Sequence, residues 1–410
     1  MTVDFTIAVA GGGAAGFFAA ITCAESIPDC KVVLLEKSPE PLAKVMISGG
    51  GRCNVTHACF DPGKLVTHYP RGNRELIGPF HRFQPRDTVR WFEERGVKLK
   101  VEPDGRMFPT TDQSTTVTQC LIREAREAGV TMMTNRGLVS VAPQSRGFLL
   151  GLSDGSHLAC DRLLIATGGN QNSPVFRVVE ELGHTIKPLL PSLFSFDCND
   201  ARLKDLAGIS VPDVEVSAPG TRLSQRGPLL VTHWGLSGPA ILKLSAWGAP
   251  QFADLDYRFI LRVCWTPDLD ESSLREQIAR ARVDFARKSV FTSNFWSIPQ
   301  RLWQSIIGHL DIRRDAIWNQ FPRGAVEPLI ETLMQTEFTI TGKSMNKDEF
   351  VTCGGVSLDE VDFKTMQSKK CRGLYFAGEI LDIDGVTGGF NFQSAWTTGW
   401  IAGKSIGQEI

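Results

Sequence analysis

The chain has 410 residues, which is enough for two or three folding units. Its 44 basic and 45 acidic residues give a net charge of -1, so neither a nucleic-acid partner nor an anionic membrane surface is expected. No apolar run is long enough to span a membrane, and the 10 cysteines lack the paired spacing of a metal site. This cysteine pattern favours reduced thiols and a cytoplasmic location.

The first part of the chain alternates strands and helices. We predict a buried strand over 5–10, a helix over 14–26 and a second buried strand over 31–36, which together form a βαβ unit. This order is typical of a parallel sheet in a nucleotide-binding domain. Further predicted elements are helices over 87–95 and 114–128, a β-meander over 137–160 and a buried strand over 162–166.

The pattern changes near residue 190. Short β segments separated by Pro and Gly over 193–265 predict a small antiparallel sheet or barrel. Residues 270–335 instead have apolar positions at helical spacing. A buried strand over 374–377 and a helix over 391–406 return to the first pattern, so we predict a nucleotide-binding domain interrupted by one insertion.

A glycine motif, Gly11-x-Gly13-x-x-Gly16, lies between the first strand and the first helix. Gly11 permits a tight turn, Gly13 lets the backbone approach a pyrophosphate, and Gly16 lets helix and strand pack closely. The helix start offers free N–H groups to the phosphates. Glu36 lies where a carboxylate can bind a ribose diol, and it would repel the 2′-phosphate of NADP. The motif predicts FAD or NAD; the alternative is a purely structural glycine turn.

A second glycine-rich segment covers residues 44–56. Its three consecutive glycines, 49–51, can press against a flat or anionic group. Arg52 can pair with a phosphate or polarise a flavin carbonyl, and Asn54 can offer a donor and an acceptor to a ring edge. Cys53 is either a packing residue or a redox thiol. The segment predicts a cofactor contact, with a solvated loop as the alternative.

Two further strand ends have the small residues that a bound nucleotide requires. The strand over 162–166 ends in Ala166-Thr167-Gly168, and the strand over 374–377 ends in Gly378-Glu379. Glycines 388 and 389 then open the final helix, whose N-terminus could face the flavin. The alternative is a strand–turn–helix without a ligand.

Taken together, five stretches of this sequence resemble the BaiN-like NAD(P)/FAD-dependent oxidoreductases. They are Gly11–Gly16, Ser48–Asn54, Thr232–Pro239, Cys353–Val356 and Gly373–Asn391, and the second is the most specific. The resemblance covers nearly the whole chain, with Cys353 as a departure from the family pattern. It implies reduction of a carbon–carbon double bond conjugated to a carbonyl, as in the bile-acid and steroid reductases of the family.

The resemblance also implies the fold class and the domains. We expect an α/β protein with a Rossmann-like FAD-binding domain and a β-meander, interrupted by an inserted β-barrel domain that carries a small helical subdomain. The FAD-binding domain would comprise 1–190 and 349–410, the barrel 191–268 and 336–348, and the helical insert 269–335.

We therefore expect an FAD-dependent oxidoreductase that passes a hydride from NADH or NADPH through flavin N5 to a small organic acceptor such as an enone. An RNA-modifying or RNA-binding flavoprotein and a flavin-binding protein without turnover stay open as alternatives. His233, Cys53 and Arg52 are the catalytic candidates, and no metal is expected. The resemblance adds Lys37 and Lys44 to the cofactor contacts. The predicted cofactor-binding residues are Gly11, Gly13, Ala14, Ala15, Gly16, Glu36, Lys37, Lys44, Ser48, Gly49, Gly50, Gly51, Arg52, Cys53, Asn54, Val139, Ala166, Thr167, Gly168, Gly378, Glu379, Asp384, Gly388, Gly389, Phe390 and Asn391.

Overall fold

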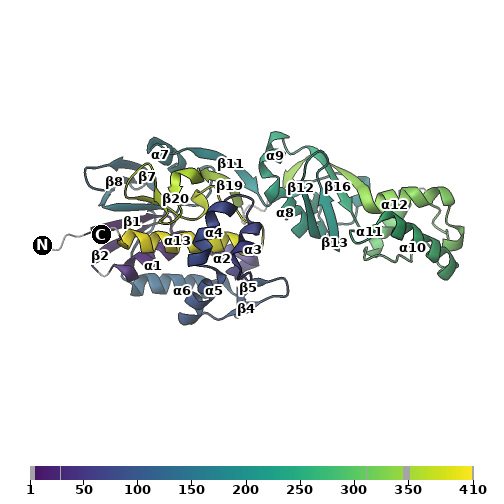
Figure 1. The fold of residues 1–410 in the computed structure, drawn as a ribbon, viewed down its shortest axis with the longest axis horizontal. Coiled ribbons are helices and arrows are strands. Elements are labelled where there is room, and N and C mark those ends of the chain that lie inside the picture. The colour runs from purple at the N-terminus through teal and green to yellow at the C-terminus, as the bar shows by residue number, and fades with distance from the viewer. Residues whose placement is uncertain (1–4, 28, 311, 345–350, 409–410) are drawn as a thin grey trace. The chain divides into compact units, whose positions relative to one another are not determined.

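The computed structural model describes residues 5–27, 29–310, 312–344 and 351–408 (Figure 1). The chain divides into two units: unit 1 comprises Met1–Pro191 and Lys347–Ile410, and unit 2 comprises Ser192–Asn346. The predicted boundary between 348 and 349 lies outside the described residues. No helix within the described ranges is long and apolar enough to cross a membrane.

A seven-stranded sheet forms the centre of unit 1. Its order is β20-β21-β22-β10-β1-β2-β6. The five strands from β22 to β6 are parallel, and the hairpin of β20 and β21 adds to them in antiparallel orientation. The parallel strands are short and apolar because helices and a second sheet bury them. The strands are β1 (Phe5–Ala10), β2 (Cys30–Leu35), β6 (Thr131–Met133), β10 (Arg162–Ile165), β20 (Val361–Asp362), β21 (Gln367–Ser368) and β22 (Leu374–Phe376).

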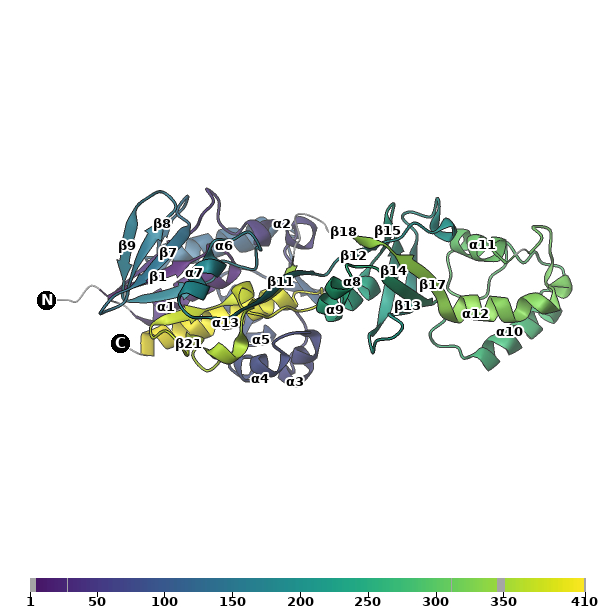
Figure 2. The same ribbon diagram turned by 90° about the horizontal axis from the view of Figure 1, so that it is seen from above.

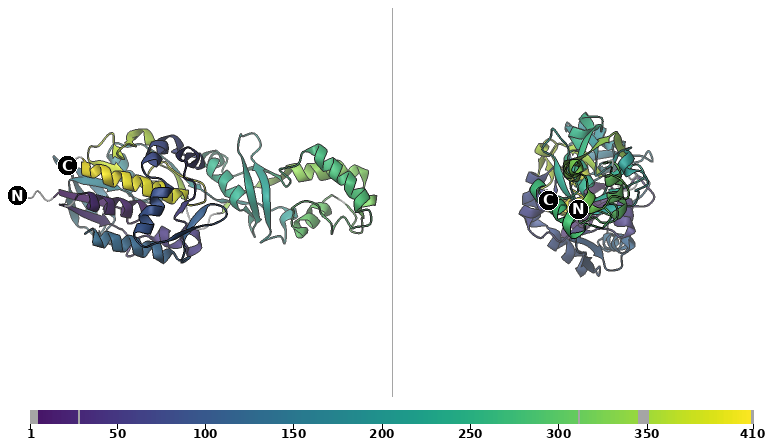
Figure 3. Two further views of the ribbon diagram at one scale, coloured as in Figure 1. Left: turned by 60° about the horizontal axis from the view of Figure 1, so that its bottom comes forward. Right: turned by 90° about the vertical axis from the view of Figure 1, so that its right-hand side faces the viewer.

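Two helices from opposite ends of the described chain pack against each other in unit 1. Helix α1 (Ala14–Ser26) lies along α13 (Phe390–Gln408), as Figure 3 shows. Glycines permit this close approach: a Cβ on Gly399 would lie 2.5 Å from the carbonyl oxygen of Ala15, and one on Gly403 would lie 2.8 Å from that of Ala19. The residues from Ala15 to Cys23 are all buried, which explains why α1 lacks a polar face.

The described residues of unit 1 also form three smaller sheets and six further α-helices. The sheet β7-β8-β9 is the predicted meander over 137–160, and Figure 2 shows it beside β1. The sheet strands are β3 (Thr56–His57), β4 (Leu99–Val101), β5 (Arg106–Pro109), β7 (Leu138–Pro143), β8 (Phe148–Leu152), β9 (His157–Cys160), β11 (Ile186–Ser192) and β19 (Val351–Val356). The helices are α2 (Ala43–Gly51), α3 (Pro62–Leu65), α4 (Asn73–Arg82), α5 (Pro85–Glu94), α6 (Ser114–Glu127) and α7 (Val175–Glu181).

Unit 2 contains an antiparallel sheet in the order β17-β16-β13-β14-β15-β12-β18. The strands at the two ends of this order, β17 and β18, are separated in the chain by Thr341 alone. The predicted closure of the sheet into a barrel stays a prediction. The strands are β12 (Ser195–Asp197), β13 (Ser210–Ser217), β14 (Ser224–Val231), β15 (Gly235–Ser237), β16 (Phe259–Cys264), β17 (Thr336–Ile340) and β18 (Gly342–Ser344).

Helices of unit 2 share an aromatic core with this sheet. Trp303 and Trp318 are fully buried, and their indole N–H groups donate to the carbonyl of Val290 and to the hydroxyl of Ser293. Buried indoles are normally paired in this way. The helices are α8 (Pro239–Trp247), α9 (Ala249–Asp254), α10 (Glu271–Asp284), α11 (Gln300–Gly308) and α12 (Val326–Gln335).

A buried hydrogen-bond network in unit 1 joins the turn at His184 to the hairpin of β20 and β21. His184 Nδ1 lies 3.1 Å from Glu360 Oε2, and Nε2 lies 2.8 Å from Ser368 Oγ. Glu360 also accepts from Lys370 Nζ at 2.5 Å and from the N–H of Thr185 at 2.8 Å. Burial lowers the pKa of His184, against the opposing effect of the Glu360 carboxylate, so the imidazole favours its neutral form.

This network predicts that stability declines as pH falls through the ordinary histidine range. The folded protein holds the pKa of His184 below its unfolded value of about 6.5, so the unfolded chain takes up the proton first. The contribution of His184 to the free energy of unfolding is therefore fully present above about pH 6.5, and it is lost as the pH falls below this value. His184→Gln removes this titration, so the stability gap between wild type and variant should narrow with falling pH in urea titrations.

A constant gap between wild type and His184→Gln over this pH range would contradict the prediction. Other titrations do not obscure the test. Burial also lowers the pKa of His57, but that residue is present in both proteins. Burial opposes ionisation of Glu360, but hydrogen bonds from Lys370 and Thr185 lower its pKa to about 2, so its own contribution is lost only at more acidic pH.

Candidate cofactor site at the carboxyl edge of the parallel sheet

Four parallel strands of unit 1 bring the predicted cofactor segments to one edge. β1, β2, β10 and β22 run in the same direction, so the residues that follow them lie at the same end of the sheet. Gly11 follows β1 and touches the turn after β10, because a Cβ on it would lie 2.3 Å from the carbonyl oxygen of Ala166. In open α/β sheets, ligands bind at this edge.

The three motif glycines have different surroundings. Gly11 has a φ of +115° and no room for a side chain. A Cβ on Gly16 would lie 1.9 Å from the carbonyl oxygen of Gly11, so the close packing of α1 on the turn requires glycine there. Gly13 has an ordinary extended backbone, and apart from its chain neighbours no atom of the described residues lies within 4 Å of a Cβ built on it. The protein itself does not require glycine at 13, and the space in front of it is open.

The start of α1 faces this open space without a side-chain cap. Gly13 is the N-cap residue, and among the residues that the structure describes no side chain caps the first N–H groups of the helix. Such N–H groups and the helix dipole bind an anion. The hydroxyl oxygen of Thr167, in the turn after β10, is buried with no hydrogen-bond partner in the described structure. These features fit the pyrophosphate of a dinucleotide.

Glu36, at the end of β2, points back to the glycine turn. Its Oε2 accepts from the N–H of Gly12 at 2.8 Å, and its Oε1 accepts from the N–H and the hydroxyl of Ser38 at 2.8 and 2.5 Å. These contacts hold the carboxylate beside the start of α1. The remaining lone pairs of its two oxygens fit a ribose diol.

Helix α2 covers the first part of the glycine-rich segment over 44–56. It begins after Leu42, whose φ is +64°, and its regular conformation is broken at Ser48, Gly49 and Gly50. Both glycines adopt left-handed conformations, with φ values of +58° and +68°. The Ser48 hydroxyl donates to the carbonyl of Val45 at 3.0 Å. A Cβ on Gly50 would meet no protein atom within 4 Å, so this bend is open on one side.

An ion pair joins this segment to the turn after β22. Lys44 Nζ lies 2.5 Å from Glu379 Oε2, and these residues are 335 positions apart in the chain. Glu379 also lies over the turn after β10, because its Oε2 would be 3.8 Å from a Cβ on Gly168. Gly378 packs on α1, where a Cβ would lie 2.8 Å from that of Ala15. The structure thus brings four predicted segments together.

Arg52, Cys53 and Asn54 each have protein partners. Arg52 pairs with Glu102 at 2.6 Å and lies over the ring of Phe108, 4.0 Å from its centroid. Cys53 is fully buried, and burial raises the pKa of its thiol to about 12, which favours the packing alternative. The amide oxygen of Asn54 accepts a hydrogen bond from the N–H of Gly389 at 2.9 Å. Cofactor contacts of these three residues stay predictions.

The loop before α13 is shaped by its own side chains. Asn391 Oδ1 accepts from the N–H of Gly385 at 2.8 Å, and Nδ2 donates to its carbonyl at 2.9 Å. The carboxylate of Asp384 is fully buried and forms an ion pair with Arg71. Phe390 is buried rather than facing solvent. It stacks on His57 and His68, with ring centroids 4.7 and 4.2 Å apart.

The remaining predicted residues are more scattered. Lys37 is exposed beside Gly137, and Val139 is an exposed residue of β7 two positions further on. Ala14 opens α1, and Gly51 and Gly388 lie in the two glycine segments already described, both with positive φ. His233 lies in unit 2 on an exposed turn.

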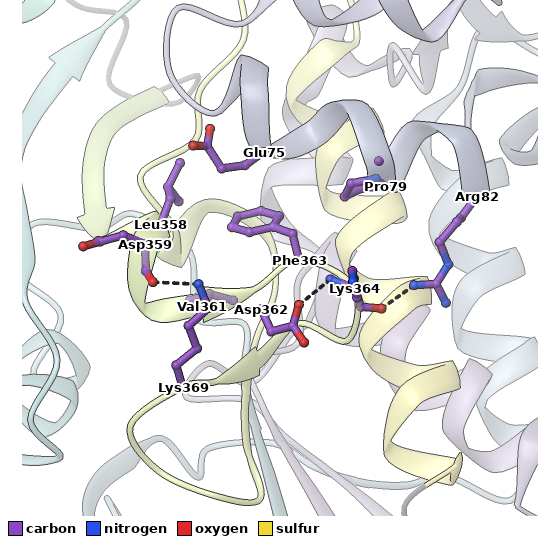
Figure 4. A pocket seen from close by; sticks show the side chains of 11 residues that line it. Glu75, Pro79, Arg82, Leu358, Asp359, Val361, Asp362, Phe363, Lys364 and Lys369 are labelled. Atoms are coloured by element: carbon purple, nitrogen blue, oxygen red, sulfur yellow. Dashed lines mark hydrogen bonds between the residues drawn. The ribbon is translucent and has the colours of Figure 1, made fainter.

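The turn at His233 borders a pocket of about 800 Å³ within unit 2. A second pocket, of about 430 Å³, lies in unit 1 between α4 and residues 358–369 (Figure 4). Phe363 lies in it, and Arg82 donates to the carbonyl oxygen of Lys364 at its rim. None of the predicted cofactor residues lines this second pocket.

Several residues at the sheet edge were not predicted from the sequence. Arg71 neutralises Asp384, and Ser38 positions Glu36. Thr352, on β19, is fully buried, and its hydroxyl has no hydrogen-bond partner in the described structure. Only Ser38 had a local signal, because a hydroxyl two residues after a strand-end carboxylate can cap it. Arg71 had none, because its partner Asp384 lies 313 positions away in the chain.

Comparison with known proteins agrees with this geometry. Residues 5–405 match the family model of the HI0933-like protein Rossmann domain. The chain is 29% identical to the ribosomal RNA dihydrouridine synthase of Escherichia coli (strain K12), over 98% of each protein. It is 27% identical to the 3-dehydro-bile acid delta(4,6)-reductase of Clostridium scindens, over 98% of this chain and 99% of that relative.

A solved structure shares the fold at low sequence identity. The 3-ketosteroid-delta4-(5alpha)-dehydrogenase from Rhodococcus jostii RHA1 matches with a TM-score of 0.52 and 14% identity, over 98% of this chain and 97% of that chain. The predicted Rossmann-like FAD-binding fold is confirmed, and so is the resemblance found in the sequence motifs. The chain belongs to the HI0933-like protein Rossmann domain family.

Proposed function

We propose that this protein is an FAD-dependent oxidoreductase that reduces a carbon–carbon double bond conjugated to a carbonyl group. The observation that carries the proposal is the open space at Gly13, directly before the uncapped start of α1. Other residues could adopt the backbone conformation of residue 13, so we infer that glycine is present there to leave room for a ligand. FAD supplies hydride chemistry when bound, which no amino-acid side chain offers.

Each chemical part of FAD can be matched to residues at the sheet edge. The first N–H groups of α1 and the Thr167 hydroxyl would hold the pyrophosphate, and Glu36 would hold the adenosine ribose. The bend at 48–51 and the loop at 385–391 would enclose the isoalloxazine. The contacts of the individual residues follow from the sequence motifs and the chemistry of these groups.

The names of the curated relatives point to one type of acceptor. One relative is named for reduction of the delta(4,6) double bonds of a 3-dehydro bile acid, and two are named for dihydrouridine synthesis in ribosomal RNA. Dihydrouridine is uridine with a saturated C5–C6 bond, and in uracil that double bond is conjugated to the C4 carbonyl. Both acceptors therefore contain an alkene conjugated to a carbonyl, which supports this class for our protein.

NADH or NADPH is the proposed source of the hydride. The sequence has no second glycine motif in a strand–helix context, so the nicotinamide would bind transiently at the flavin rather than in a domain of its own. The ten cysteines are all unpaired in the structure, which supports a reducing compartment such as the cytoplasm.

Anaerobic stopped-flow measurements test the proposal. We expect NADH or NADPH to bleach the visible flavin absorbance, and we expect an alkene–carbonyl acceptor to restore it with one acceptor consumed per flavin. The panel contains 3-oxo-Δ4 steroids, simple enones and ribosomal RNA without dihydrouridine. Reoxidation by none of these acceptors would overturn the proposal.

The same panel separates the small-molecule acceptor from the second candidate, a uracil in RNA. The name of the Escherichia coli relative favours RNA, and the near-zero net charge favours a small molecule. Reoxidation by ribosomal RNA alone, with RNA binding that weakens as salt is raised, would select the RNA-modifying function. Reoxidation by enones alone would select the small-molecule reductase.

A further inference from the structure

Asp382 is a half-buried carboxyl group at the same sheet edge as the predicted cofactor residues. It lies two positions after the 3₁₀ turn Gly378–Ile380 and three before Gly385. Its N–H donates to the carbonyl of Val356 at 3.1 Å, and its Oδ1 accepts from the N–H of Gly354 at 3.0 Å. β19 therefore fixes both the backbone and one oxygen of Asp382, while Oδ2 has no hydrogen-bond partner within the described ranges.

The surroundings of Asp382 shift its pKa in opposite directions. Burial raises its pKa, and the nearby carboxylate of Asp384 acts in the same direction. The N–H of Gly354, the guanidinium of Arg71 and the ammonium of Lys187 lower the pKa, but they do not offset the burial. Arg71 is already paired with Asp384, which limits how far it can lower the pKa of Asp382. The carboxyl group thus keeps its proton to higher pH than an ordinary aspartate.

The other proton-bearing groups nearby are engaged or enclosed. The Tyr69 hydroxyl is fully buried and donates to the carbonyl of Phe390 at 2.6 Å. Glu379 is ion-paired with Lys44. The Cys353 thiol is buried, and burial raises its pKa to about 11, which leaves it protonated but shielded. Glu379 is also partly exposed, but it is held by a cation, whereas the partly exposed Asp382 carboxyl forms no ion pair within the described ranges.

We propose that Asp382 is the proton donor in the reduction of the conjugated alkene. The inference rests on the proposed function and adds a residue to it. The carbon β to the carbonyl takes up a hydride, which the NADH or NADPH class of reductant ultimately supplies. The α carbon takes the proton of the Asp382 carboxylic acid. The C=C π bond breaks, two C–H bonds form, and the acceptor gains two electrons in total. Water then reprotonates the Asp382 carboxylate.

Half-reaction kinetics of Asp382→Asn test this assignment. Flavin reduction by NADH or NADPH should change by less than about twofold, whereas reoxidation by the alkene–carbonyl acceptor should slow by about 100-fold or more. Reoxidation by ferricyanide, which takes electrons without a proton, should not slow. Asp382→Glu should restore part of the acceptor rate, and Asp284→Asn, at an exposed position of α10, should behave as wild type.

A second readout does not depend on turnover. In an infrared difference titration of wild type against Asp382→Asn, the wild type should show one additional carboxylic acid, with a titration midpoint above that of an ordinary aspartate. The acceptor rate of wild type should fall as pH rises through the same value, and the rate of the variant should not.

The outcomes separate this inference from the proposed function. If wild type reduces an acceptor and Asp382→Asn does so at the same rate, the proton-donor assignment is wrong and the function stands. If the variant loses both half-reactions, or loses ferricyanide reoxidation as well, its role is structural and the assignment is also wrong. If wild type itself reduces no acceptor, the proposed function fails first.

Discussion

Gly13→Val is expected to give a folded protein that no longer holds FAD. The valine side chain would occupy the open space before α1, where the proposed pyrophosphate approaches the backbone. We expect FAD affinity to fall by at least about 100-fold, which is about 2.7 kcal/mol. Valine can adopt the extended backbone of residue 13 but is a poorer N-cap than glycine, so the free energy of unfolding of the apoprotein should fall by only about 1 kcal/mol. Flavin titration and urea denaturation measure the two quantities.

Two other glycine variants serve as controls for Gly13→Val. Gly16→Ala places a Cβ 1.9 Å from the carbonyl oxygen of Gly11, so it should destabilise the apoprotein itself by about 1–3 kcal/mol. A Cβ on Gly78, in α4, would contact no neighbouring segment of the described chain, so Gly78→Ala should leave FAD affinity intact and should stabilise the apoprotein by up to about 1 kcal/mol. Full FAD binding by Gly13→Val, or unfolding of its apoprotein, would contradict the proposed cofactor position.

Arg71→Leu should be among the most destabilising single substitutions in unit 1. The Asp384 carboxylate is 0% exposed and forms an ion pair with Arg71, whose side chain is 17% exposed. Removal of the cation leaves a buried charge without its main partner, which costs about 3–5 kcal/mol. Urea denaturation of the apoprotein measures the loss, so the result does not depend on FAD.

A surface pair and a second-site change serve as controls for Arg71→Leu. Arg90 and Asp87 form an exposed pair in α5, with 63% and 30% of their side chains exposed, so Arg90→Leu should cost less than about 1 kcal/mol. Asp384→Asn, added to Arg71→Leu, removes the unpaired charge and should restore part of the stability. Equal effects of Arg71→Leu and Arg90→Leu would show that burial of the pair does not matter.

The sequence predicted the elements whose signals are local. The first strand, the first helix and the glycine turn between them follow from a short apolar run and from glycines at fixed spacing. Glu36 was predicted from its distance to the motif, and it does turn back to the N–H of Gly12. Such features depend on a few neighbouring residues, so they can be inferred without knowledge of the remaining chain.

Contacts between distant segments could not be predicted in the same way. Arg71 has no local pattern that indicates Asp384, and Lys44 has none that indicates Glu379. Asp384 was predicted as a cofactor contact, which stays a prediction, and its buried ion pair with Arg71 was not predicted. The bend in α2 was also not predicted as part of a helix, because glycines normally disfavour helices.

Unit 1 is built from two stretches of chain, with all of unit 2 between them. On the ribosome, β10 therefore emerges long before β22, its partner in the sheet, and α1 before α13, which covers it. Unit 2 is continuous and can complete its core during this interval, because domains fold as units during synthesis. Until β22 has been made, β10 forms an open edge of the nascent sheet. This is therefore the interval in which the newly made protein is most exposed to aggregation and to capture by chaperones.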